Sequence, residues 1–205
     1  MRTAFKENLL RKLGEESFTK IQEARIAIAG AGGLGSNCAA ILVRTGFRNL
    51  KIVDFDRVEA PNLDRQFYFA DQVGMPKVEA LRQNLLRINP ELGLWIENVR
   101  LERSNARALL GDCDIVAECL DTAEGKSMLV SELLPDHPFI VAVSGLGGLG
   151  ESDEIRVHRI RTNLVVIGDL RSDIAFRPAL SPRVAVAAAK QADVILEHVA
   201  LGRIA

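Results

Sequence analysis

The chain has 205 residues, of which 48% are hydrophobic, and its formal net charge is −1. This length is enough for one full α/β core and short for two, and the near-neutral charge argues against a nucleic-acid partner. Three cysteines without CxxC spacing favour neither a disulfide framework nor a zinc site, so we expect no structural zinc. Without a leader pattern or a membrane-length apolar run, we expect a soluble cytoplasmic protein with no membrane partner.

The first 24 residues are predicted to be helical. Apolar residues within 3–23 follow helical spacing, with a break expected near Gly14. We interpret residues 1–24 as a segment that packs on the sheet or on another subunit. The alternative is that Arg2 or Arg11 acts directly in catalysis. Residues 25–205 are then expected to form one nucleotide-binding domain.

A glycine-rich turn follows the first predicted strand. Alternating apolar residues lead into Gly30-x-Gly32-x-x-Gly35, and the apolar positions after it switch to helical spacing. This is the strand–turn–helix context that a dinucleotide fingerprint requires. Gly30 permits the tight turn, Gly32 lets backbone N–H groups approach a phosphate, and Gly35 lets the helix pack on the strand. We therefore expect a nucleotide phosphate at this turn.

An acidic residue ends the next predicted strand, residues 50–54. Asp54 lies 24 residues after Gly30, close to the spacing of about 20 expected for a carboxylate that binds the ribose. Ribose binding is the favoured interpretation, and the alternative is that Asp54 simply ends the strand.

A polar loop, residues 55–68, delays the next helix. It leaves the carboxyl end of the sheet, where open α/β folds bind their ligands. The side chains that could reach a phosphate or the attacking group are Asn62, Arg65, Gln66 and, at the start of the helix predicted over 77–88, Lys77. Arg65 or Lys77 alone is more typical of a solvated side chain on the protein surface. Together with the glycines they favour phosphate binding.

A second acidic position follows the strand predicted over 114–119. If the strand order is doubly wound, this strand lies beside the first one at the topological switch point, and Asp121 sits over the same crevice as Gly32. A carboxylate facing a polyphosphate normally needs a cation between them, so we expect magnesium at Asp121. The alternative is that Asp121 caps the helix predicted over 123–134.

A second glycine-rich run, residues 144–150, also matches GxGxxG by letters. The residues that follow it alternate like a strand and do not open a helix. We therefore reject a second nucleotide site and interpret this run as a flexible connection.

The C-terminal part completes the predicted fold. Residues 155–160 and 164–168 are predicted to form a hairpin that continues the sheet in the antiparallel direction, and residues 169–178 are expected to be mobile. Ser181 and Pro182 are typical of the start of a final helix, with Ser181 as its cap. The predicted fold class is α/β: a Rossmann-like, doubly wound, mainly parallel sheet with antiparallel strands at its C-terminal end.

Several motifs occur in order over about residues 20–200. They are Gly30–Asn37, Val53–Asp56, Val58-Glu59, Asn62–Gln66, Gly74–Lys77 and Asp121. In this order they resemble the ThiF/MoeB/HesA superfamily of ubiquitin-like-protein activating enzymes, most closely the short ThiF-like branch of thiamine biosynthesis. The resemblance implies an enzyme that binds ATP and magnesium and adenylylates the C-terminal glycine carboxylate of a small ThiS-like sulfur carrier, releasing pyrophosphate. It also implies a homodimer.

The resemblance assigns roles to residues one by one. The nucleotide and its phosphates would be held by Gly30, Gly32, Gly33, Gly35, Asp54, Asp56, Asn62, Arg65, Gln66 and Lys77. Asp54 would take the ribose, Asp121 the magnesium, and the catalytic set would be Arg65, Lys77 and Asp121.

The sequence also departs from the longer family members. Their paired CxxC zinc site is absent, no cysteine lies where a thioester-forming residue is expected, and their Asp-Asn-x-x-x-Arg pattern reads Asp121-Thr122-Ala-Glu-Gly-Lys126. An arginine supplied from the N-terminus across a dimer is not recognisable beyond Arg2 and Arg11. These departures affect sulfur transfer more than adenylylation.

Two other functions stay open. One is an NAD-binding oxidoreductase, which the glycine motif and Asp54 alone would support. The other is a nucleotide-binding module without turnover. Attack of a carboxylate on a phosphate brings two anions together, so the cations Arg65 and Lys77 favour adenylyl transfer over hydride transfer.

Overall fold

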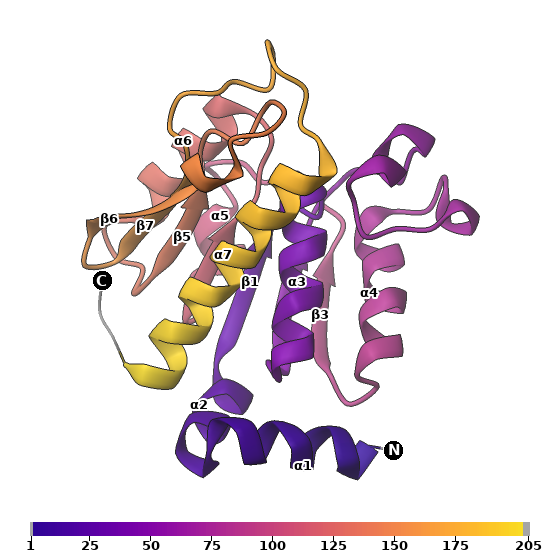
Figure 1. Cartoon of the computed structure of the whole chain (residues 1–205), viewed down its shortest axis with the longest axis vertical. Helices are drawn as coiled ribbons and strands as arrows, with labels where there is room; N and C mark the ends of the chain where they lie inside the picture. Colours follow the sequence, from indigo (N-terminus) through magenta and orange to yellow (C-terminus); the bar gives the residue numbers. More distant parts are fainter. Residues whose placement is uncertain (1, 203–205) are drawn as a thin grey trace.

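A seven-stranded sheet forms the centre of the computed structural model, which describes residues 2–202 (Figure 1). Its strands are β1 (Arg25–Ala29), β2 (Asn49–Val53), β3 (Gly93–Glu97), β4 (Ile115–Glu118), β5 (Ile140–Val143), β6 (Arg156–Arg161) and β7 (Leu164–Gly168). The strand order is β3-β2-β1-β4-β5-β7-β6, and every neighbouring pair is parallel except β6 with β7. The predicted Rossmann-like, mainly parallel sheet is confirmed.

Helices cover both faces of this sheet. They are α1 (Arg2–Leu13), α2 (Glu15–Glu23), α3 (Gly33–Thr45), α4 (Lys77–Ile88), α5 (Ala106–Leu110), α6 (Ala123–Leu133) and α7 (Ser181–Leu201), with short 3₁₀ turns η1 (Ala60–Asp64), η2 (Ala70–Gln72) and η3 (Ser152–Glu154). α3, α4 and α7 lie on one face, and α5 and α6 on the other (Figure 1). No helix in the described part of the chain has the length and apolar character that a membrane span needs.

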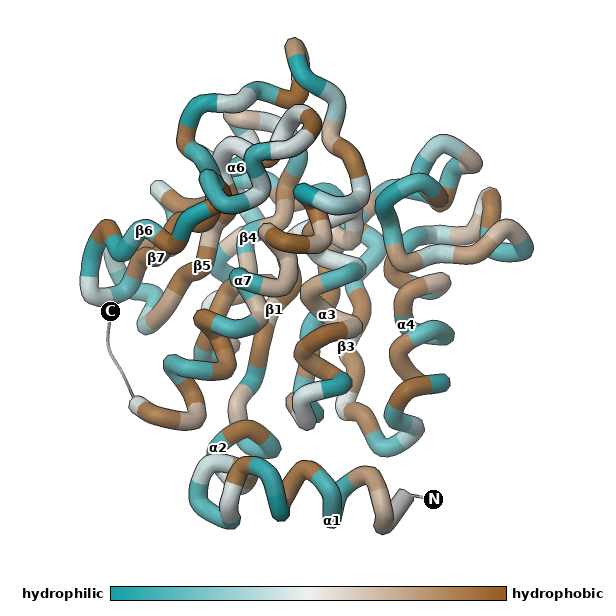
Figure 2. The backbone as a smooth tube through the Cα atoms, in the orientation of Figure 1, coloured by the Kyte–Doolittle hydropathy of each residue, from teal (hydrophilic) through white to brown (hydrophobic). Residues whose placement is uncertain are grey.

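The alternation of side chains along β1 builds both halves of the core. Ile26 and Ile28 pack with the apolar residues of α3, α4 and α7, whereas Ala27 and Ala29 pack with those of α5 and α6. All four residues are fully buried, and strands β1 and β5 are coloured mainly in the brown of hydrophobic residues (Figure 2). A parallel sheet covered on both faces explains why this strand is apolar at every buried position.

In the C-terminal part of the chain, the structure differs in detail from two expectations. The predicted hairpin is present, but β7 pairs in parallel with β5, so β6 alone runs antiparallel, at the edge. α7 begins at Ser181, with Leu180 in the N-cap position and no side-chain cap, so the prediction that Ser181 caps this helix is wrong. Pro182 lies in the first turn, where its missing N–H costs nothing.

The N-terminal helices α1 and α2 lie across the amino end of the strands (Figure 1). The hydroxyl of Ser17 donates to the Ala200 carbonyl of α7, and the amide of Gln22 donates to the Gly46 carbonyl after α3. This segment therefore packs on helices of its own chain, at the end of the sheet opposite to the glycine turn.

Candidate nucleotide-binding site

A cavity of about 630 Å³ opens at the carboxyl ends of the central strands. Predicted residues that line it are Gly30, Gly32, Gly33, Asp54, Asp56, Arg65, Gln66, Lys77 and Asp121. They come from the glycine turn, the end of β2, the loop after η1, the start of α4 and the turn after β4. The cavity lies at the topological switch point between β1 and β4, where doubly wound sheets bind ligands.

The three motif glycines of this turn have different surroundings. At Gly30, where φ is +100°, a Cβ would lie 2.7 Å from the Cys119 carbonyl oxygen. At Gly35, which lies inside α3 and does not line the cavity, it would lie 1.8 Å from the Gly30 carbonyl oxygen. At Gly32 the nearest atom, Nε2 of Gln66, is 3.9 Å away, so this position is open toward the cavity. The turn therefore presents the N-terminus of a 13-residue helix to a ligand.

Asp54 fastens this turn to the end of β2. One carboxylate oxygen accepts the N–H of Ala31 at 2.6 Å, and the other accepts the N–H of Asp56 at 2.7 Å. Burial raises the pKa of Asp54, and the two N–H donors act in the opposite direction. Asp54 thus supports the glycine turn in addition to lining the cavity.

Lys77 is a buried cation at the cavity wall. Its Nζ lies 2.8 Å from Oδ2 of Asp56, and its side chain is 8% exposed. The hydroxyl of Tyr68 donates its single proton to the carbonyl of Ala31 at 2.6 Å, and its oxygen lies 3.3 Å from the carbonyl of Lys77. Tyr68 therefore joins the glycine turn to the start of α4. No sequence motif indicated this role, because the contact forms only when the loop folds back.

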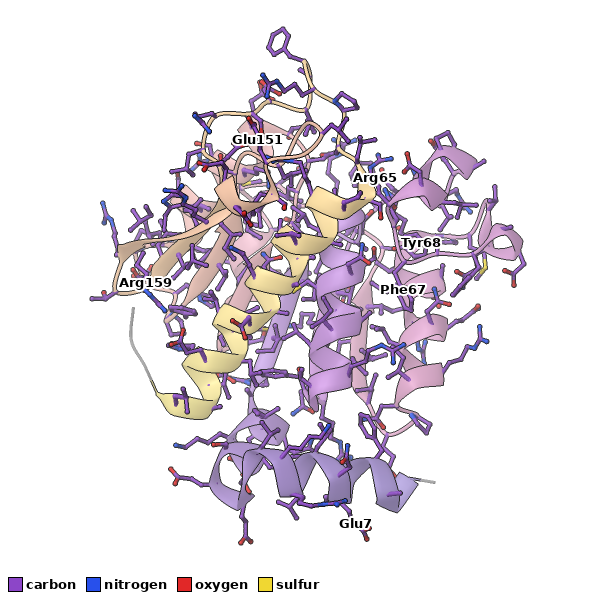
Figure 3. All side chains as sticks on the ribbon, viewed as in Figure 1. Glu7, Arg65, Phe67, Tyr68, Glu151 and Arg159 are labelled. Carbon is purple, nitrogen blue, oxygen red and sulfur yellow. The ribbon has the colours of Figure 1, made fainter. Side chains whose placement is uncertain are left out.

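The loop that carries Arg65 is held on the first turn of α3. The amide of Asn37 donates to the Arg65 carbonyl at 2.9 Å, and the hydroxyl of Ser36 accepts the N–H of Phe67 at 3.0 Å. In Figure 3, Arg65 lies near the upper ends of α3 and α7, above Phe67 and Tyr68. Asn37 and Ser36 thereby place the Arg65 side chain at the cavity.

Gln66 and Asn62 have different surroundings. The Oε1 atom of Gln66 is buried and has no hydrogen-bond partner among the described residues, and the residue lines the cavity. Asn62 does not line the cavity, since its side chain accepts the N–H of Glu59 at 3.0 Å and closes the η1 turn. Its place in the motif is explained locally by the shape of the loop.

Asp121 is an exposed carboxylate at the cavity. Its side chain forms no hydrogen bond or ion pair with another residue that the structure describes. Thr122 caps α6, with its hydroxyl accepting the N–H of Gly125 at 3.1 Å, so the N-cap alternative for Asp121 is wrong. Within residues 2–202 no three His, Cys, Asp or Glu side chains gather to hold a metal. A divalent ion would therefore need ligands from phosphate and water beside Asp121, as magnesium usually has in nucleotide sites.

A further wall was not predicted from the sequence. Val99, Arg100 and Leu101, after β3, line the cavity beside Phe55. The Arg100 guanidinium stacks on the Phe55 ring, 3.9 Å from its centroid. An apolar wall with a stacked pair suits a flat ligand group such as a nucleobase.

Two segments expected to be flexible also line the cavity. They are Ser144–Leu146 and Leu170–Ile174. Next to the second segment, Asp169 pairs with Arg183 at 2.6 Å, with both side chains less than 10% exposed. Arg183 also donates to the carbonyl of Leu146 at 3.2 Å. One buried arginine on α7 thus fastens both segments. The second glycine run leads directly into the 3₁₀ turn η3 and not into an α-helix.

Of the two N-terminal arginines, Arg11 is remote from this cavity in the chain described. Arg11 lies on α1, the helix that crosses the bottom of Figure 1, whereas Arg65 lies near the top in Figure 3. The side chain of Arg2 lies outside the described part of the structure. Arg11 therefore cannot act in the cavity of its own chain in this arrangement.

Known proteins are similar to this chain in sequence and in fold. The molybdopterin-synthase adenylyltransferase of Escherichia coli (strain K12) is 35% identical over 122 residues, which are 59% of this chain and 49% of that protein. The adenylyltransferase and sulfurtransferase UBA4 of Candida glabrata is 35% identical over 133 residues, 64% of this chain and 31% of that protein. The chain thus spans half or less of the length of these relatives.

A solved structure matches over nearly the whole chain. The tRNA N6-threonylcarbamoyladenosine dehydratase TcdA of E. coli, in complex with ATP, superposes with a TM-score of 0.88 and 20% identity, covering 98% of this chain and 95% of that one. At this identity the likeness shows the fold alone. A family model described as "ThiF family" matches residues 5–151, which is more than half of the sequence. The chain therefore belongs to the ThiF family.

Proposed function

We propose that this protein is an ATP-dependent adenylyltransferase that activates the C-terminal glycine carboxylate of a small, ubiquitin-like sulfur carrier of the ThiS type, in thiamine thiazole formation. The observation that carries the proposal is that one cavity gathers a helix N-terminus, Lys77, Arg65 and the carboxylate of Asp121. Hydride transfer to NAD would use the glycine turn and Asp54 but neither of these cations.

The reaction joins two anions. A carboxylate oxygen of the carrier attacks the α-phosphorus of ATP, the bond from that phosphorus to the bridging oxygen of the β-phosphate breaks, and pyrophosphate leaves with the electron pair. The products are an acyl-adenylate and pyrophosphate. Lys77 and Arg65 lower the repulsion between the reactants and stabilise the charge on the leaving group. Magnesium held at Asp121 would neutralise phosphate charge at the same place.

The remaining residues bind and position the nucleotide in this proposal. The phosphates rest on the turn formed by Gly30, Gly32, Gly33 and Gly35. Asp54 takes the ribose, and the wall at Phe55 and Arg100 takes the base. Asp56 holds the Lys77 ammonium, and Asn62 shapes the loop that carries Arg65 and Gln66. The relatives named as adenylyltransferases and the ATP complex of TcdA support ATP as the nucleotide.

The cysteines support adenylylation without a thiol step. Cys38, Cys113 and Cys119 are all buried and free. Burial raises the pKa of Cys38 to about 12 and that of Cys113 to about 11, and it raises the pKa of Cys119 well above its ordinary value. A thiolate is the form that attacks carbonyl or sulfur groups, so none of the three suits a thioester or a persulfide.

The test is ATP–pyrophosphate exchange with purified candidate carriers. We expect exchange that requires a ThiS-like carrier and its terminal glycine, and that is lost in Lys77→Ala and Asp121→Ala. A molybdopterin-type carrier in parallel tests the choice of partner. Absence of exchange with every carrier would exclude the proposal, and thermal stabilisation by NAD but not by ATP would favour the oxidoreductase. Nucleotide binding without exchange would leave a nucleotide-binding module without turnover as the function.

We also infer that residues 25–205 form the adenylyltransferase domain and that the protein is a homodimer. Light scattering on the purified chain tests the oligomeric state. Deletion of residues 1–24 tests the boundary, because the domain should keep nucleotide binding without them.

A further inference from the structure

A buried ion pair lies directly under the turn that carries Asp121. Glu118 ends β4 and is fully buried, and its two carboxylate oxygens lie 3.2 and 3.1 Å from the Nζ of Lys126. One of these oxygens also accepts the N–H of Leu120 at 2.7 Å. Glu118 therefore fixes the backbone immediately before Asp121.

Lys126 secures the other side of the same turn. It lies in α6, lines the cavity, and keeps 23% of its side chain exposed. Its backbone N–H donates to the carbonyl of Thr122 at 3.0 Å, and Thr122 caps this helix. Asp121 is thus held between two anchored residues, although its own side chain forms no hydrogen bond or ion pair with other described residues.

The charges of the pair depend on each other. Burial raises the pKa of the Glu118 carboxyl, and Lys126 acts in the opposite direction. A buried carboxylate that loses its cation is costly. Conversely, a Lys126 ammonium that loses Glu118 could pair with the carboxylate of Asp121, which lines the same cavity. It would then compete there with a divalent cation.

We propose that the Glu118–Lys126 ion pair positions Asp121 and keeps the Lys126 ammonium away from it, so that the cavity accepts a divalent cation together with the nucleotide. Both are positioning residues, and neither needs to touch the ligand. The inference deepens the proposed function and rests on it, because it takes Asp121 as the residue that holds the metal.

The experiment measures Mn²⁺ affinity by electron paramagnetic resonance, with a non-hydrolysable ATP analogue present. Glu118→Gln keeps an acceptor for the Leu120 N–H but releases the Lys126 ammonium, and we expect Mn²⁺ to bind about tenfold more weakly. Lys126→Met leaves Glu118 unpaired and should also weaken binding. The double variant removes both charges, and we expect its affinity to return to within about threefold of the wild type.

The control variant is Lys51→Gln. It removes another lysine ion pair, to Asp112 at 2.6 Å, from a position that does not line the cavity. We expect its Mn²⁺ affinity to equal that of the wild type. Thermal unfolding of all variants is measured alongside, because a purely structural pair would change stability without changing Mn²⁺ affinity among the folded variants.

The outcomes separate the two proposals. Wild-type Mn²⁺ affinity in Glu118→Gln, or a double variant as weak as the weaker single variant, would overturn the inference; the second result would mean that Lys126 contacts the ligand itself. Either result leaves the proposed function standing, provided that the wild type binds Mn²⁺ with the analogue and Asp121→Asn does not. Failure of the wild type to bind the metal–nucleotide pair would instead remove the proposed function.

Discussion

Alanine substitutions at two glycines of the Gly30-x-Gly32-x-x-Gly35 motif should have different effects. At Gly35 an added Cβ would lie 1.8 Å from the Gly30 carbonyl oxygen and 3.0 Å from Cγ2 of Ile28. At Gly32, where φ is −77°, the nearest atom is 3.9 Å away. We therefore expect Gly35→Ala to lose stability, and Gly32→Ala to fold normally but to bind the nucleotide more weakly.

The magnitudes follow from these contacts. Alanine gains about 1 kcal/mol over glycine inside a helix, but forcing a methyl group against fixed backbone costs about 3 kcal/mol or more, so Gly35→Ala should lose at least about 2 kcal/mol. Gly32 is the N-cap of α3, where alanine is worse than glycine by about 0.5–1 kcal/mol, and the stiffer unfolded chain offsets about 0.4–1 kcal/mol of this. The net change at Gly32 should be within about 0.5 kcal/mol.

The binding loss at Gly32 comes from the approach of the phosphate. Hydrogen bonds to a charged group contribute about 1.5–3 kcal/mol. A methyl group that displaces the phosphate from the backbone N–H groups should therefore weaken the binding of ATP about 10- to 100-fold. Urea denaturation measures the free energy of unfolding of both variants, and calorimetric titration with ATP and magnesium measures binding.

The reasoning would be refuted by the reverse pattern. If Gly32→Ala binds ATP like the wild type, no phosphate approaches this turn. If Gly35→Ala is as stable as the wild type, the contact with Gly30 does not constrain the turn.

Three further substitutions test the parts that support the cavity. Lys77→Met should reduce exchange at least about 100-fold while lowering stability by only about 1 kcal/mol, since its partner Asp56 is 42% exposed and can be solvated; exchange kinetics beside urea denaturation measure both. Tyr68→Phe removes the donor to the Ala31 carbonyl, so it should lower the free energy of unfolding by about 1 kcal/mol and weaken the binding of ATP. An unchanged affinity for ATP would contradict this. The pKa of Asp169 lies below its ordinary value because, although burial raises it, the backbone N–H groups of Arg171 and Ser172 donate to the carboxylate. Its stabilisation is therefore complete above the unfolded pKa of about 4 and is lost as pH falls through the lower folded pKa, so Asp169→Asn should be less stable than wild type at neutral pH and converge with it below about pH 4 in denaturation curves.

Local sequence patterns were sufficient to predict the centre of the fold. The glycine spacing, the strand before it and the acid at Asp54 are all encoded within short stretches, so the sheet order around β1 and the place of the cavity could be predicted. Asp121 was placed correctly over the cavity because the doubly wound rule brings β4 beside β1.

The supports of the cavity could not be predicted in this way. Arg183 joins Leu146, 37 residues earlier, and Tyr68 joins Ala31, also 37 residues earlier, and neither pair leaves a periodic or spaced signal in the sequence. For the same reason, the contact of Arg183 with the second glycine run could not be predicted, and this run was interpreted as a flexible connection. Asn62 shows the converse: its motif pointed to the phosphate, whereas its side chain closes a local turn.

The most direct test of the central claim is mass spectrometry of the carrier after incubation with the protein, ATP and magnesium. The account predicts one adenylyl group on the terminal glycine carboxylate of the carrier and one pyrophosphate released for each, with both lost in Lys77→Met. A carrier that stays unmodified while ATP is bound, or release of ADP in place of pyrophosphate, would contradict it.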